Sequence, residues 1–351
     1  MNFSFIIFLG ISIVFLIVWI TYVILRKEKK YLDQFNNEEI REKLNQLSKV
    51  TKGIGWLTIL STLGVIISGI VWAATARDVK PLPKSDAAEM THVHGMSYTA
   101  DGNKLVLATH EGLRYYENGN WSSVEGQNHD YMGFSATDDG FYSSGHPAPG
   151  SKLKDPFGII KSTVGEQSFQ QLALYGEMDF HGMSVGFKSH AIYVLNPASN
   201  GKMSSTGLYY SLDQAQTWTR SESSGLEGQV QALAVHPTEE STLAIGTNKG
   251  AFLSTDYGQT FKKIGVDGPA TSLFFNNDGT LWAGGFQLTL VNPETLQNET
   301  VNLPDLEDRD MIEYVAQNPM QSQTVAFITF NNLLYITNDA GDTWKQVMIP
   351  V

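Results

Sequence analysis

The chain contains no cysteine among its 351 residues. This absence excludes a disulfide framework, a thiolate metal site and a cysteine nucleophile. It also suits an exported bacterial domain, where a free thiol would be open to oxidation. Site chemistry must therefore rest on histidine, methionine, carboxylate and hydroxyl groups.

Charged side chains are missing from two segments, 1–25 and 53–76. The stretch from Phe3 to Leu25 is apolar over more than 20 residues, a length that crosses a bilayer as a helix. No basic region precedes it and no small-residue cleavage site follows it, so it reads as a retained span and not a signal peptide. The second uncharged run predicts a second transmembrane helix.

The segment between these runs, 26–52, carries eight Lys and Arg against five Asp and Glu. The positive-inside rule places it in the cytoplasm and both chain ends outside. Apolar residues recur in it at helical spacing, which predicts a short amphipathic helix: Leu32, Phe35, Ile40, Leu44 and Leu47. Residues 77–90 form a polar, proline-containing linker, and 91–351 form an extracytoplasmic domain held at the cell membrane.

This outer part of the chain has few cationic residues. Residues 77–351 hold 16 Lys and Arg against 31 Asp and Glu. Such a surface repels phosphate backbones, so we expect no nucleic-acid partner and regard cations as better suited.

An internal repeat marks this region. Ser254-Thr-Asp-Tyr-Gly-Gln-Thr-Phe261 matches Thr337-Asn-Asp-Ala-Gly-Asp-Thr-Trp344. Ser211 to Trp218 is the same pattern with alanine at the glycine position, and Ser162 to Phe169 is a decayed copy. The starting residues lie 49, 43 and 83 positions apart, so the last interval is about two periods.

The repeated residues resemble the Asp-box, or BNR repeat, of sialidases, sortilin-type receptors and photosystem II assembly-factor propellers. Proteins of this group are often labelled glycosyl hydrolase-like. The resemblance implies that each motif lies between the third and fourth strands of a propeller blade, and that its aspartate is structural.

Short β-type runs tile the whole domain with this period. They predict an all-β fold, a six-bladed β-propeller of four-stranded blades, attached to the transmembrane helical hairpin. Seven blades are the nearest alternative, although no 40-residue segment is left unassigned. The expected blades are 91–125, 130–173, 179–221, 229–265, 269–302 and 311–348.

When the blades are aligned on their inner strands, each of the six blades supplies one residue at the same position. That position carries, in blade order, His94, Met132, His181, Gln231, Thr271 and Glu313. Inner strands line the axis of a propeller, so these side chains are expected to converge on its central channel.

More histidines fall on the same face in blades one to three. They lie at the ends of second strands or just before inner strands: His92, His110, His129 and His146. Imidazoles suit copper, zinc, iron and nickel, and a thioether selects copper(I). The pattern predicts a binding protein with a copper or similar metal site built from His94, Met132 and His181 with His110 or His146, and with Glu111 or Asp130 orienting the imidazoles.

Two other functions stay open. A glycosyl hydrolase-like enzyme would use carboxylates at the same mouth. The candidates are Glu111, Asp130, Asp179 and Glu313, and no spacing singles out a pair. The resemblance implies an arginine triad for a sialidase, whereas the outer domain has only four scattered arginines: Arg77, Arg114, Arg220 and Arg309. The last alternative is a protein-assembly scaffold or sortilin-like receptor with a membrane-protein partner.

Overall fold

A computed structural model describes residues 19–30, 42–56, 80–81, 92–123, 128–162 and 169–349. The chain divides into two compact units, Met1–Asp78 and Val79–Val351, and each is described by itself.

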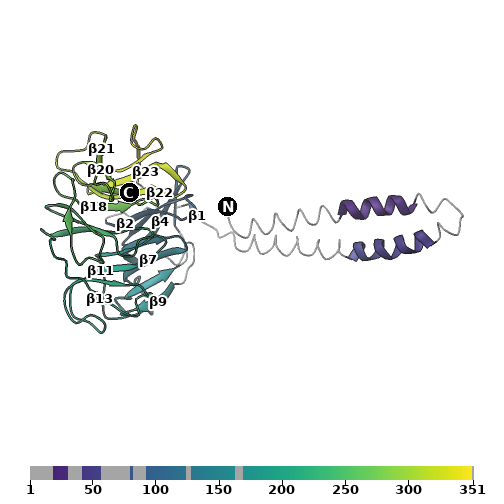
Figure 1. Ribbon diagram of the computed structural model, residues 1–351, viewed down its shortest axis with the longest axis horizontal. Helices are drawn as coiled ribbons and strands as arrows, with labels where there is room; N and C mark the ends of the chain where they lie inside the picture. The colour runs from purple at the N-terminus through teal and green to yellow at the C-terminus, as the bar shows by residue number, and fades with distance from the viewer. Residues whose placement is uncertain are drawn as a thin grey trace. The chain divides into compact units, whose positions relative to one another are not determined.

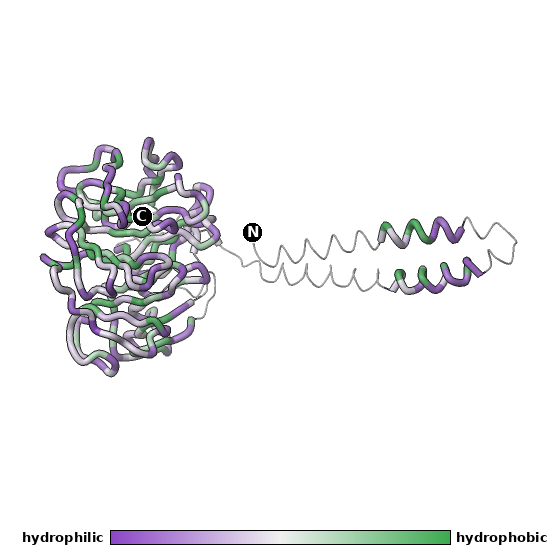
Figure 2. The backbone as a smooth tube through the Cα atoms, in the orientation of Figure 1, coloured by the Kyte–Doolittle hydropathy of each residue, from purple (hydrophilic) through white to green (hydrophobic). Residues whose placement is uncertain are grey.

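The first unit contains two helical segments, 19–30 and 42–56. They lie side by side (Figure 1), with the Lys29 ammonium 3.5 Å from the Ser48 hydroxyl. Both change from hydrophobic to hydrophilic toward the connection between them (Figure 2). Within the described residues, neither helix has the length and apolarity needed to cross a membrane. Most of the two predicted spans, and much of the predicted amphipathic helix, lie outside the described residues.

The second unit is a six-bladed β-propeller, as predicted (Figure 1). Blades one to three follow the chain order from the axis outward, and a short extra strand, β1, pairs with the outer strand of blade one. Their strands are β1 (Lys80–Pro81), β2 (Val93–Tyr98), β3 (Leu105–Thr109), β4 (Gly112–Glu117), β5 (Asn120–Ser123), β6 (Asp130–Thr137), β7 (Gly140–His146), β8 (Ile159–Ser162), β9 (Phe169–Ala173), β10 (Met183–Val185), β11 (Ile192–Asn196), β12 (Gly207–Ser211) and β13 (Thr219–Arg220).

Blades four to six repeat the same antiparallel order of four strands. The four main strands of each sheet fall within the predicted blades, whereas the extra strand β1 lies in the segment predicted as a linker. Their strands are β14 (Val230–Val235), β15 (Leu243–Thr247), β16 (Gly250–Ser254), β17 (Lys262–Lys263), β18 (Ser272–Phe275), β19 (Leu281–Gly284), β20 (Leu288–Val291), β21 (Asn298–Val301), β22 (Ile312–Asn318), β23 (Gln321–Thr329), β24 (Leu334–Thr337) and β25 (Lys345–Val347).

The hydrophobic core consists of six clusters, and each fills the space between two neighbouring blades. Second strands such as β3 and β15 are buried at every residue, because a blade contacts a neighbour on both of its faces. This explains their continuous apolar sequences. The outer strands β13 and β17 are exposed and short.

The repeated motif forms the same turn in blades three, four and six, between the third and fourth strands. In blade four, Asp256 accepts hydrogen bonds from the Thr260 amide at 2.9 Å and the Thr260 hydroxyl at 2.6 Å. Asp213 and Asp339 make the equivalent bonds. Most of the fourth copy lies outside the described residues.

The ring closes by packing of blade six against blade one. One core cluster joins Leu105 and Leu107 of blade one to Ala326 and Ile328 of blade six. The Trp121 indole N–H also donates to the Met348 carbonyl at 2.9 Å. Among the described strands, none is shared between the two blades, so side-chain contacts hold this junction.

Candidate functional site

A cavity of about 500 Å³ follows the propeller axis and is lined by the inner strands. The six aligned positions all line it, as predicted: His94, Met132, His181, Gln231, Thr271 and Glu313. Residues from the far ends of the inner strands, such as Pro319 and Asn277, line it as well, so the cavity extends along the axis. We call the end where the inner strands begin the mouth.

β-Bulges place several of these side chains at the mouth. In β2, Val93 pairs with Thr109 and Gly95 with Ala108, so His94 is the extra residue of a bulge. Gln231 and Glu313 occupy the same extra position in β14 and β22. A bulge re-aims a side chain and is common beside functional sites. Here it directs three of the six aligned side chains toward the cavity.

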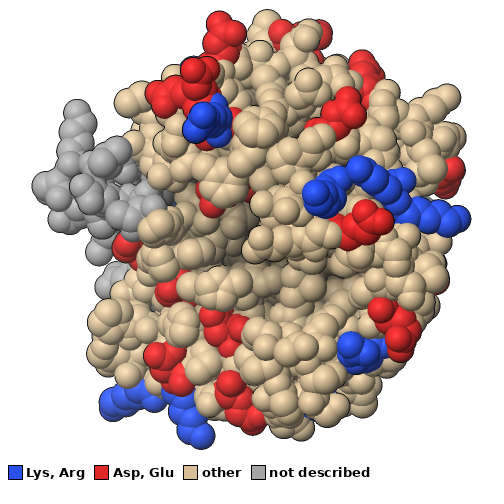
Figure 3. Space-filling model, turned by 90° about the vertical axis from the view of Figure 1, so that its left-hand side faces the viewer, with Lys and Arg blue, Asp and Glu red and all other residues tan. Residues whose placement is uncertain are grey.

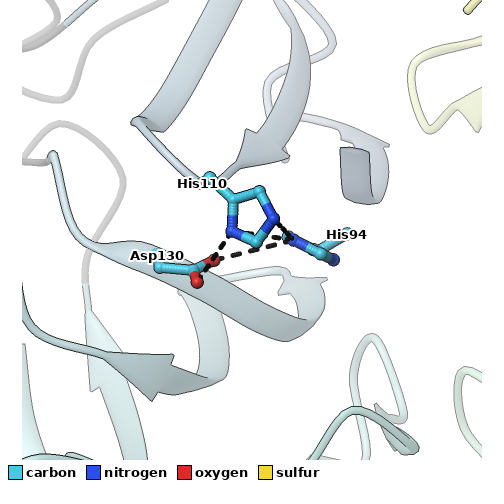
Figure 4. A group of neighbouring side chains, drawn as sticks. All are labelled: His94, His110 and Asp130. Carbon is cyan, nitrogen blue, oxygen red and sulfur yellow. Dashed lines mark hydrogen bonds and ion pairs between the residues drawn. The ribbon is translucent and has the colours of Figure 1, made fainter. Parts of the chain in front are cut away.

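His94, His110 and Asp130 form a compact group at the mouth (Figure 4). One nitrogen or oxygen atom from each lies within 4.8 Å of the others. His110 Nδ1 is 2.8 Å from Asp130 Oδ2, and His94 Nε2 is 3.3 Å from His110 Nδ1. The residues come from the start of β2, the end of β3 and the start of β6. Two blades therefore contribute to one group.

His92 and His181 extend this group. The His92 ring lies 5.3 Å from that of His110, and the His181 ring lies 6.4 Å from that of His94, measured between centroids. Burial lowers the pKa of His94 from 6.5 to about 4, and the neighbouring imidazoles add to this while Asp130 opposes it. His94 is thus neutral at neutral pH, the form in which imidazole coordinates a metal.

A second set of side chains lies beside the first, around Asp179. His181 Nε2 is 2.9 Å and His146 Nε2 is 3.4 Å from Asp179 Oδ2. His146 Nδ1 contacts Asp155 at 2.5 Å. Burial opposes protonation of His146, but the Asp155 hydrogen bond and the Asp179 charge raise its pKa above 6.5.

Met132 and His129 occupy different surroundings from the imidazole group. Met132 is buried and lines the cavity. His129 packs against Phe157 and Phe169, and its Nδ1 accepts the Ala148 amide at 2.9 Å. Burial lowers its pKa.

The remaining carboxylate candidates, Glu111 and Glu313, have different surroundings. The Glu111 carboxylate accepts the Thr109 hydroxyl at 3.3 Å, beside His110 in sequence. Glu313 lines the cavity, and burial together with the charge of Asp310 raises its pKa from 4.5 to about 7. A carboxyl with such a pKa can hold a proton near neutral pH.

Of the two aspartates around His146, Asp179 was among the predicted carboxylate candidates and Asp155 was not. Asp179 precedes the aligned residue of blade three, His181, by two residues, as Asp130 precedes Met132, so its place follows from the repeat. Asp155 lies in the connection between β7 and β8, which is longer than the equivalent connection between β3 and β4 in blade one. No periodic signal points to it.

A third His–carboxylate group lies at the other end of the inner strands and joins blades two and three. His190 Nε2 is 2.7 Å from Asp138 Oδ1 and 3.6 Å from Asp139 Oδ1. The Lys161 ammonium, 2.7 Å from Asp139, already neutralises part of this group. Elsewhere, acidic side chains are spread around one face of the propeller, which is hollowed near its middle (Figure 3).

No family model matches the chain. A curated relative, a xyloglucanase from Hypocrea jecorina (strain QM6a), is 38% identical over 61 residues. The match covers 17% of this chain and 7% of the relative, so the chain spans a small part of that protein's length. Two similar solved structures are a GH74 enzyme from Niastella koreensis and YCF48 bound to D1 peptide.

The Niastella koreensis enzyme is 15% identical with a TM-score of 0.48, and the similarity covers 73% of this chain and 45% of that one. YCF48 is 16% identical with a TM-score of 0.43, covering 78% of this chain and 85% of that one.

Proposed function

We propose that this chain is a metal-binding propeller that holds a divalent transition-metal ion between His94, His110 and Asp130. The observation that carries the proposal is the compact arrangement of two imidazoles and one carboxylate from separate strands. Five imidazoles lie at the same mouth, far more than hydrogen bonding within a core requires: His92, His94, His110, His146 and His181.

The ligand atoms favour particular metals. Imidazole nitrogen with carboxylate oxygen suits Zn²⁺, Fe²⁺, Ni²⁺ and Cu²⁺, whereas copper(I) prefers thioether or thiolate sulfur. Because Cu²⁺ binds such sites most tightly in the divalent series, copper remains the first candidate, in its oxidised form. The three protein ligands leave positions for water or a further imidazole.

The test is a metal titration of the full-length chain in detergent, after removal of bound metal with a chelator. We expect His94→Ala and His110→Ala each to weaken Cu²⁺ and Zn²⁺ binding by at least about tenfold, or ~1.4 kcal/mol. His236→Gln, a histidine substitution away from the mouth, is the matched control and should bind as the unaltered chain does. Equal affinity in all four proteins would contradict the proposal.

A glycosyl hydrolase-like activity is the second candidate. It is favoured by the 61-residue match to a xyloglucanase and by Glu313, a carboxyl in the cavity whose pKa of about 7 suits a general acid. The chain would be assayed on xyloglucan and on a panel of aryl glycosides, with and without chelator. Activity lost in Glu313→Gln and kept in Glu294→Gln, an exposed control, would support it; no hydrolysis of any substrate would remove it.

We further propose that the propeller belongs to the Asp-box group and is anchored at the outer face of a cell membrane by the N-terminal segments. The repeated aspartate turns support the first part. The uncharged runs flanking a basic segment support the second. This location would put the metal site in contact with the exterior of the cell.

A further inference from the structure

Two members of the second set of side chains at the mouth, His146 and Asp179, repeat two members of the first, His110 and Asp130, after rotation by one blade. His110 directly follows β3, and His146 is the last residue of β7, the equivalent strand of the next blade. Asp130 stands two residues before the aligned position of blade two, and Asp179 stands two residues before that of blade three. The counterpart of His94 in blade two is Met132, so the second imidazole comes from the aligned residue of blade three, His181, whose Nε2 lies 2.9 Å from Asp179 Oδ2. The second group therefore contains two imidazoles and one carboxylate: His146, His181 and Asp179.

The two groups adjoin each other. Asp130 of the first group and His146 of the second are directly paired across the β6–β7 hairpin. The His94 and His181 rings, one from each group, have centroids 6.4 Å apart. Two ions held by these groups would thus be near neighbours at one mouth.

The carboxylates of both groups have an oxygen atom that accepts no hydrogen bond, although His94 Nε2 lies 3.7 Å from Asp130 Oδ1. Asp130 Oδ1 and Asp179 Oδ1 are buried without a hydrogen bond, and the two side chains are only 18% and 15% exposed. A buried carboxylate oxygen without a donor is costly, and coordination to a cation would remove that cost. Each group has one such atom, which points to one ion for each.

We infer that the mouth holds two divalent metal ions, the first between His94, His110 and Asp130 and the second between His146, His181 and Asp179. The inference rests on the proposed function and extends it from one ion to a pair. His146 Nε2 and His181 Nε2 both approach Asp179 Oδ2, so that oxygen is the centre of the second group. Asp155, on His146 Nδ1, would orient that imidazole from behind.

A pair of ions has a chemical consequence that a single ion lacks. Two metals a few ångströms apart can bind one bridging water or oxyanion, because both attract the same oxygen. The acidic surface would be offset locally by their four positive charges. Small anions are therefore the class of ligand that a doubly loaded mouth would accept.

The experiment counts ions in the full-length chain, in a His190→Gln background that disables the His–Asp group at the other end of the inner strands. Metal-free protein is equilibrated with Zn²⁺ and analysed by elemental analysis, and with Cu²⁺ and examined by electron paramagnetic resonance. We expect two ions per chain and, with Cu²⁺, a half-field signal from two coupled spins. Asp179→Asn and His181→Gln should each reduce the count to one and abolish the coupling.

His181→Gln keeps the test decisive if Asp179→Asn misfolds, because the His181 side chain is 67% exposed and its loss should not disturb the core. One ion in the unaltered protein, lost in Asp130→Asn and kept in Asp179→Asn, would overturn the inference while leaving the proposed function standing. Loss of all metal in a folded His181→Gln would overturn it as well. Absence of any bound ion would remove the proposed function itself.

Discussion

Asp130 and His146 face each other across the β6–β7 hairpin, and each belongs to a different group of potential metal ligands. The backbone between them therefore sets the distance between the two groups. The residue next to His146 is Gly145, which adopts a positive φ of 127° and pairs with Tyr131. A side chain there would meet the Asp130 carbonyl oxygen at 2.1 Å.

Gly145→Ala should consequently damage both stability and metal binding. The added Cβ forces the two strands apart, and alanine is strained at this φ, so we expect a loss of more than about 1 kcal/mol in the free energy of unfolding. Metal affinity should fall by at least about tenfold because Asp130 and His146 move. Thermal unfolding and Zn²⁺ titration measure the two effects.

The control for this change is Gly268→Ala. Gly268 also has a positive φ, 79°, but no heavy atom would lie within 4 Å of its added Cβ. It should lose some stability through backbone strain and keep full metal affinity. Unchanged affinity in Gly145→Ala would mean that the strand spacing does not govern the site.

The stability of the propeller should depend on pH through Glu313. Its pKa of about 7 lies above its ordinary value of 4.5, so between these values the folded chain retains a proton that the unfolded chain has lost. The stabilisation is complete below about pH 4.5 and declines as the pH rises to 7, by roughly 1 kcal/mol per pH unit. Glu313→Gln should remove this decline.

Denaturant unfolding at several pH values, with chelator present, measures this pH-dependent contribution of Glu313 to stability. The glutamine variant should gain stability over the unaltered chain progressively from pH 5 to pH 7, and the gain should level off above that. A difference between the two proteins that is constant over this range would show that Glu313 titrates normally.

The repeated aspartates should act on stability alone. Asp256→Ala removes the acceptor for the Thr260 amide and hydroxyl, and should cost about 1 to 2 kcal/mol in the free energy of unfolding. Metal affinity should not change, because this turn lies outside the mouth. Asp267→Ala, at an exposed site, should change stability by less than about 0.5 kcal/mol. Equal free energies of unfolding for the two variants would show that the Asp256 turn does not stabilise the propeller.

The proposed membrane orientation can be read with single cysteines, because the chain has none of its own. Asn45→Cys, in the basic segment, should resist a membrane-impermeant maleimide in intact cells and react after lysis. Asp267→Cys, in the propeller, should react in both. Reaction of Asn45→Cys in intact cells would place the basic segment outside and reverse the orientation.

The sequence carried enough information to predict the propeller because its repeats are periodic. Turns built on Asp213, Asp256 and Asp339 mark the end of third strands, and the period locates every inner strand from them. The six aligned positions were predicted to meet at the axis, and they line one cavity. Closure of the ring could not be predicted, since it depends on side-chain packing between blades with no shared pattern.

The composition of the ligand group was harder to predict. His94 reaches the mouth as the extra residue of a bulge, and a bulge leaves no mark in a sequence alignment. Met132 aligns with His94, yet the ladder around it is irregular one residue later, between Met132 and Ser135. Asp130, which the sequence predicted as a carboxylate that orients an imidazole, lies 2.8 Å from His110 Nδ1.

The junction between blades one and six differs from the other five junctions of the ring. Every other pair of blades is joined by continuous chain, whereas this seam is held by apolar contacts and a few hydrogen bonds such as that from Trp121. The imidazoles lie on blades one to three, so a bound cation would stabilise the contacts among these blades. It would not stabilise the contact between blades one and six. Local unfolding of the propeller would then begin with separation of blades one and six, in the metal-bound protein as well.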